Sequence, residues 1–129
     1  MKIIPEFLYS KNDEWVEIKG NSATIGISDY AQNALSDIVF LEIIASVGDQ
    51  VTAGDNIATV ESVKAASDVY TPVTGKISAV NDGVTDAPET INQDPFGGAW
   101  FVKLTSDSGF DTSDLMNAEQ YQQYCDERG

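Results

Sequence analysis

The sequence of 129 residues contains no histidine and only one cysteine, Cys125. Without histidine, the chain lacks the commonest general base, the usual zinc ligand and the partner that activates a serine or cysteine nucleophile. A single cysteine cannot form an internal disulfide, so nothing indicates an oxidising compartment. These absences argue against a hydrolase and against a metal site, zinc above all.

Basic residues are also scarce: 7 lysines and arginines stand against 21 acids, for a net charge of −14. This charge repels nucleic-acid phosphates and anionic membranes, although it would either steer the chain toward basic protein partners or only keep it soluble. The N-terminus lacks the apolar core of a signal peptide, and Glu42 interrupts the most apolar run. We expect no nucleic acid, no membrane, and a cytoplasmic protein, or a mitochondrial one if this is a mature organelle form.

Short β-branched segments separated by turn residues dominate the chain. The segment 38–44 is apolar on both faces apart from Glu42 and is expected to run through the core. We predict a mainly β fold, a β-sandwich or flattened barrel, in one domain over 1–129 with its core at about 15–105. The expected strands are 15–19, 23–27, 38–44, 57–60, 69–71, 76–80 and 100–104.

Short peripheral helices and a C-terminal helical segment at about 113–127 complete the prediction. Ser28 is placed to cap the first helix, and a one-turn helix should begin at Asp86. Near the C-terminus we expect helix at 114–116 and then a longer helix capped by Asn117. Three residues recur on that helix at helical spacing and should pack against the sandwich, which makes the cysteine structural rather than reactive: Ala118, Tyr121 and Cys125.

The segment from Val60 to Asp68 holds Lys64 between small residues, with an acid on either side. It lies between two predicted strands, so Lys64 should stand at the tip of a hairpin. Ala65 and Ala66 leave its amine unshielded. The residues alone allow two interpretations: a solvated lysine at a turn, or an amine presented to an acylating enzyme.

The octapeptide from Glu61 to Asp68, ESVKAASD, resembles the lipoylation motif of the H-protein of the glycine cleavage system. The resemblance extends along almost the whole chain, in the family's order and at its approximate spacing. Further matching segments are 13–16, 24–32, 37–40, 47–49, 92–97 and Trp100.

This resemblance implies a non-catalytic carrier with lipoate linked as an amide to Lys64. In the family, pyridoxal-phosphate-dependent glycine decarboxylase leaves an aminomethyl group on the arm. Aminomethyltransferase passes the methylene to tetrahydrofolate, and dihydrolipoyl dehydrogenase reoxidises the dithiol. A lipoylating enzyme must select Lys64, and Glu61 and Ser67 are expected to contribute to that recognition. A shuttle must leave each partner, so we expect a monomer that docks transiently.

The loaded arm of the family folds back into a surface cleft, and the residues that match its lining are Glu14 and Asp68, with Asn12 as a weaker third. A cationic amine on the arm favours carboxylates and limited water. Alternatively, Glu14 is a solvated acid at a strand edge and Asp68 an ordinary turn residue. Asp13 stands where the family usually has histidine, and an added acid beside Glu14 should disfavour ionisation of both.

Other carriers fit less well. Biotinyl carriers place methionines on both sides of their lysine, where this chain has Val63 and Ala65. Lipoyl domains of 2-oxo acid dehydrogenase complexes are shorter and are usually joined to further domains by flexible linkers, and no such linker is found here. Two alternatives stay open: an H-like protein that mainly donates lipoyl groups to other enzymes, and an unmodified interaction domain that would tolerate Lys64→Arg.

Overall fold

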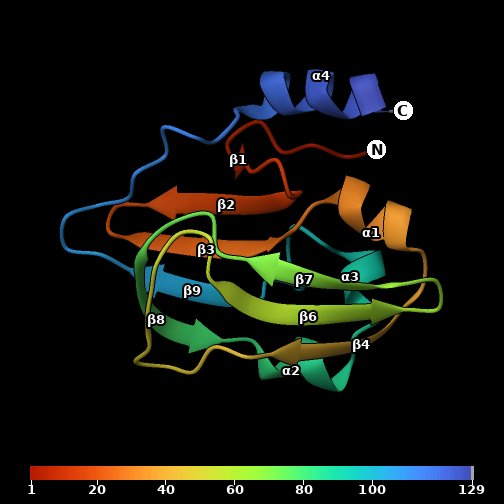
Figure 1. The fold of residues 1–129 in the computed structure, drawn as a ribbon, viewed down its shortest axis with the longest axis horizontal. Helices are drawn as coiled ribbons and strands as arrows, with labels where there is room; N and C mark the ends of the chain where they lie inside the picture. The colour runs from red at the N-terminus through yellow and green to blue at the C-terminus, as the bar shows by residue number, and fades with distance from the viewer. Residues whose placement is uncertain (129) are drawn as a thin grey trace.

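The computed structural model describes residues 1–128 and contains two antiparallel sheets (Figure 1). The six-stranded sheet has, in spatial order, β1 (Leu8–Tyr9), β2 (Glu14–Lys19), β3 (Ser22–Ile27), β9 (Val102–Thr105), β8 (Gly75–Val80) and β5 (Gln50–Val51). The three-stranded sheet has β4 (Ile38–Ile43), β6 (Asn56–Ser62) and β7 (Ala66–Tyr70). Neither sheet closes on itself within residues 1–128, so the predicted mainly β fold is confirmed in its sandwich form.

Both sheets contribute to one apolar core. In β3, Ala23, Ile25 and Ile27 are all buried, as the two-residue period of a strand predicts. Leu41 and Val60 of the smaller sheet belong to the same cluster. The core therefore lies between the sheets, and burial of one face of each sheet holds the sandwich together.

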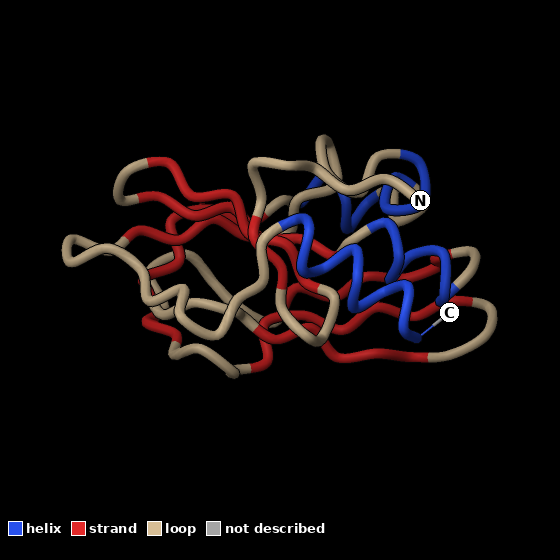
Figure 2. Tube along the Cα trace, turned by 90° about the horizontal axis from the view of Figure 1, so that it is seen from above, coloured by secondary structure: helices blue, strands red, loops and turns tan. Residues whose placement is uncertain are grey.

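A second, aromatic cluster joins β1 and β2 to the C-terminal helix α4 (Ala118–Arg128). Tyr9 stacks on Tyr121 with ring centroids 4.4 Å apart. Cys125 is free and buried in this cluster, as the helical spacing predicts. Figure 2, seen from above, shows α4 lying over the strands, with both ends of the described chain at the same end of the molecule.

Two helix caps predicted from sequence are present. Ser28 caps α1 (Asp29–Leu35), because its hydroxyl accepts a hydrogen bond from the Ala31 amide at 3.1 Å. Asn117 and Gln120 form a reciprocal capping box at the start of α4. No helix within residues 1–128 has the length and apolar character needed to cross a membrane.

The prediction of a helix that begins at Asp86 is wrong. Asp86 instead ends α2 (Asp82–Asp86), and α3 (Thr90–Gln93) follows after a break. Each of these short helices buries one apolar side chain, Val84 in α2 and Ile91 in α3. Packing of these two residues, which no local pattern reveals, sets the helix boundaries.

Residues 114–116 are not helical either. Met116 forms an isolated bridge with Tyr9, each amide donating to the other's carbonyl at 2.8 Å. The free edge of β1 thus supplies hydrogen-bond partners that a single helical turn would lack.

Strand β4 does not run through the core as predicted. It is an edge strand of the smaller sheet, and only Ile38 and Leu41 are buried along it. The pairing with β6 shifts register between Ile38 and Phe40, which leaves Val39 55% and Phe40 46% exposed. Strand β4 therefore has apolar residues on both faces, although one face is buried and the other is open to solvent.

Close packing between β2 and β3 depends on Gly26. Trp15 lies opposite Gly26 in the register, and an added Cβ would lie 2.7 Å from the indole Nε1. The Trp15 side chain is buried and cannot move aside without losing its hydrogen bond to the Pro95 carbonyl.

We expect Gly26→Ala to lower the free energy of unfolding by about 1–3 kcal/mol, because the methyl group overpacks against a buried ring. Urea denaturation followed by tryptophan fluorescence measures the change. Gly83→Ala is the control, since a Cβ there meets only Asn81 Oδ1 at 3.4 Å. Equal stability of the two variants would contradict this account.

Candidate functional site

Lys64 stands at the tip of the β6–β7 hairpin, as predicted, and this hairpin projects beyond the neighbouring strands (Figure 1). The lysine is exposed, as are Ala65 and Ala66 beside it. The antiparallel pairing places Glu61 opposite Ala66, so the turn between them is short. The two side chains that follow Lys64 are therefore small and leave its amine accessible.

The turn is organised by Ser62, which sequence reasoning missed. Its hydroxyl accepts hydrogen bonds from the amides of Lys64 and Ala65, at 3.1 and 3.0 Å, and donates to the Ala65 carbonyl at 3.1 Å. One side chain thus holds the backbone on both sides of the lysine. A serine two residues before a turn lysine is the sequence signal for this motif.

Two further contacts attach the hairpin tip to the body of the protein. The Val63 amide donates to the Asp37 carbonyl at 3.0 Å, at the entry to β4. The Lys64 Nζ donates to the Ala34 carbonyl at 3.2 Å. Ala34 lies in the last turn of α1, where a cation is favoured by the negative end of the helix dipole.

A surface pocket of about 230 Å³ lies where β2 begins and β7 ends. Glu14 and Asn12 line it, together with Lys11 and Tyr70. Glu14 is only 2% exposed, so its interpretation as a solvated acid is wrong. Its carboxylate accepts hydrogen bonds from the Ser10 hydroxyl and, at 3.1 Å, from the Tyr70 amide.

The other predicted site residues lie on the hairpin rather than around this pocket. Glu61 and Ser67 are exposed near the tip. Asp68 is exposed on β7, opposite Thr59, whose hydroxyl donates to it at 3.2 Å. Asp68 shares one face of β7 with Tyr70, two residues further along, and Tyr70 reaches the pocket. Strand β7, five residues long, thus joins the hairpin tip to the Glu14 pocket over roughly 17 Å at about 3.3 Å per residue.

The family model described as glycine cleavage H-protein matches residues 7–128. The chain belongs to the glycine cleavage H-protein family. The glycine cleavage system H protein of Carboxydothermus hydrogenoformans is 43% identical over 130 residues, covering 100% of this chain and 99% of that protein. The one from Thermoanaerobacter pseudethanolicus is 46% identical over 127 residues, covering 98% and 99%. The crystal structure of a glycine cleavage system H protein from Mycobacterium marinum superposes with a TM-score of 0.83 and 32% identity, covering 98% and 99%.

In this H-protein family member, the electrostatic environment of Glu14 is set mainly by burial. Burial raises the pKa of the Glu14 carboxyl above its ordinary value, while the hydrogen bonds from Ser10 and Tyr70 oppose that rise. The neighbouring charge of Asp13 raises the pKa further, as the sequence predicts, but as the smallest of these causes. The pocket therefore presents a carboxyl group whose ionised form a nearby cation would stabilise.

We expect Ser62→Ala to release the turn that presents Lys64. The Lys64 and Ala65 amides lose their acceptor, so their hydrogen exchange should accelerate about tenfold, and the free energy of unfolding should fall by about 0.5–1.5 kcal/mol. Exchange measured by NMR tests this. Ser67→Ala is the matched control, because that hydroxyl makes only a 3.4 Å contact with its neighbour's carbonyl. Similar exchange in both variants would show that Ser62 does not hold the turn.

The raised pKa of Glu14 predicts a pH dependence. The folded protein binds this proton at higher pH than the unfolded chain does. Stability therefore falls as pH rises from about 4.5, the ordinary value, through the folded-state pKa, and is constant above it. The loss is about 1.4 kcal/mol for each unit by which the pKa is raised.

Glu14→Gln should remove that part of the profile. We expect the free energy of unfolding of the wild type, minus that of the variant, to decrease over this pH window in urea denaturation series. Glu17→Gln, on the same strand, controls for loss of one carboxylate at a position that is 31% exposed. Parallel profiles for the wild type and Glu14→Gln would show that Glu14 is not protonated preferentially in the folded state.

Proposed function

We propose that this chain is the lipoyl-carrying, non-catalytic subunit of the glycine cleavage system and that lipoate is attached to Lys64. The observation that carries the proposal is the exposed amine of Lys64 on a projecting hairpin whose turn is fixed by Ser62. Membership of the H-protein family supports it. Other lysines are engaged differently: Lys19 pairs with Glu17 at 3.5 Å, and Lys103 lies over the Trp100 ring at 4.8 Å.

The residues around Lys64 fit an acyl group on its amine. The side chains of Ala65 and Ala66 are too small to obstruct a linear chain. Acylation would remove the charge of the Lys64 amine, whose hydrogen-bond partner is the Ala34 carbonyl near the end of α1. When bound there, the lipoyl group would supply a disulfide that is reduced as it takes an aminomethyl group from glycine decarboxylase. The dithiol left after aminomethyltransferase removes the methylene would be reoxidised by dihydrolipoyl dehydrogenase. The chain's own task is then to present the arm and to receive it.

The pocket beside Glu14 is the part of the chain suited to receive a cationic group. Glu14 contributes a buried carboxylate, and Asn12 lies on the same wall. A cation bound there would lower the pKa of Glu14 again and would be partly withdrawn from water. Asp68 contributes a second carboxylate on the face of β7 that leads to the pocket. We assign Glu61 and Ser67, next to the tip, to recognition by the lipoylating enzyme.

Incubation with a lipoate ligase, lipoate and ATP tests the attachment site. Intact-protein and peptide mass spectrometry should find one lipoyl group on the wild type, located on Lys64, and none on Lys64→Arg. Lys19→Arg is the control, because Lys19 is also an exposed lysine at the end of a hairpin, and it should be modified as fully as the wild type. Lipoylation of Lys64→Arg, or lipoyl groups spread over several lysines, would refute the proposal.

A further inference from the structure

The sequence contains one arginine, Arg128, and it lies at the end of α4. Its guanidinium donates two hydrogen bonds to the Asp13 carboxylate, at 3.1 and 2.6 Å. The Arg128 Cζ also lies over the rings of Tyr30 and Tyr124, 4.2 and 4.0 Å from their centroids. The two charged side chains are 29% and 16% exposed, so this pair is partly desolvated. A planar group that forms two hydrogen bonds to one carboxylate and contacts two aromatic rings is restricted in its orientation.

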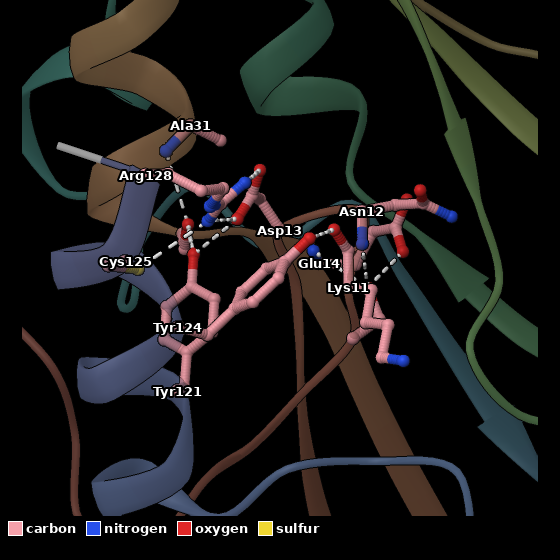
Figure 3. A network of polar contacts seen from close by, with 11 residues as sticks. Lys11, Asn12, Asp13, Glu14, Ala31, Tyr121, Tyr124, Cys125 and Arg128 are labelled. Carbon is pink, nitrogen blue, oxygen red and sulfur yellow. Dashed lines mark hydrogen bonds and ion pairs between the residues drawn. The ribbon is translucent and has the colours of Figure 1, made fainter.

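Helix α4 contacts the turn formed by residues 10–14 through two more side chains. Tyr121 donates to Asp13 Oδ1 at 2.7 Å, and Tyr124 donates to the Lys11 carbonyl at 3.0 Å. Burial raises the pKa of Tyr121 far above its ordinary value, so its hydroxyl stays a donor to the carboxylate. Figure 3 shows Asp13 between these α4 side chains on one side and Glu14 and Asn12 on the other.

The backbone of Asp13 explains why this attachment matters for the pocket. Asp13 has φ 68, in the left-handed region that side chains other than glycine rarely occupy. The resulting reversal of the chain brings the Glu14 amide onto the Ser10 hydroxyl at 3.1 Å, the same oxygen that accepts the Asn12 amide at 3.2 Å. The same hydroxyl donates to the Glu14 carboxylate. The conformation at Asp13 therefore directs Glu14 into the pocket.

We propose that Arg128 is a positioning residue for the Glu14 pocket: by binding Asp13 it keeps the 10–14 turn in its reversed conformation and compensates the acid next to Glu14. The use of the pocket for a loaded arm rests on the proposed function, whereas the hold on the turn does not. Asp13 and Arg128 act as a matched pair, because the acid alone would add an uncompensated charge beside a buried carboxyl.

Four charged or titratable groups of the described chain lie near Glu14. Asp13 precedes it in the chain, Lys11 lies on the turn, Tyr70 lies on β7, and Asp114 lies in the segment that leads to α4. Loss of Arg128 changes the compensation of Asp13 and leaves the other three in place. Glu14 should then become protonated at higher pH.

Two NMR measurements on the unlipoylated full chain test the proposal: hydrogen exchange at the Asn12 and Glu14 amides, and the ¹³C titration of the Glu14 carboxyl. In Arg128→Ala both amides should exchange at least tenfold faster, and Glu14 should titrate at higher pH. In Arg128→Lys the titration should return toward the wild type, because the charge is kept. The amides should stay fast, because lysine lacks the planar fork and the stacking.

Gln122→Ala is the matched control, since among residues 1–128 the Gln122 side chain bonds only Asp126, on the exposed side of the same helix. It should leave both readouts unchanged. The proposal is overturned if both amides in Arg128→Ala exchange within twofold of the wild type, or if the β6 and β7 amides accelerate equally, which would indicate a general loss of stability. These readouts require no lipoate, so their failure is distinct from failure of Lys64 to be modified.

Discussion

The carboxylate of Asp13 is the contact on which the arrangement of the site depends. It binds Arg128 and Tyr121 from α4, while the Asp13 main-chain carbonyl accepts the Ser28 amide at 2.9 Å. A left-handed residue other than glycine costs roughly 1–2 kcal/mol, and contacts from three directions offset that cost. The first turn of α1, the end of α4 and the start of β2 are thereby fastened at one residue, directly before Glu14.

Helix α1 and strand β7 connect this junction to the lysine tip. Ser28 caps α1 and shares a 2.6 Å hydrogen bond with Tyr121, and the other end of the helix offers the Ala34 carbonyl to Lys64. Strand β7 leads from the tip to Tyr70, whose amide binds Glu14. Helix α1 and strand β7 thus each connect the hairpin tip to the Glu14 pocket and fix their relative position. A carrier with a long mobile arm benefits from such a frame, because only the arm must be ordered when it docks.

Features set by neighbouring residues could be predicted from the sequence, and features set by distant packing could not. The Lys64 hairpin and the caps at Ser28 and Asn117 carry their own turn and capping signals. The exposure of Phe40 follows from the register shift between β4 and β6, which the apolar sequence of β4 conceals. Only the family resemblance points to Glu14 as a cleft residue, because its hydrogen bonds come from Ser10 and from an amide 56 residues away, which no local pattern indicates.

The composition explains why the pocket needs a residue from the far end of the chain. With 21 acids and 7 bases, most carboxylates must be left to water, and Asp13 is a partly buried acid next to a buried one. Local sequence supplies Lys11, but a lysine is a point charge that lacks the planar fork needed to bind both oxygens of a carboxylate and contact two rings. The single arginine, 115 residues from Asp13, meets both requirements. The aromatic cluster that seats α4 on β1 and β2 therefore also determines the charge and shape of the Glu14 pocket.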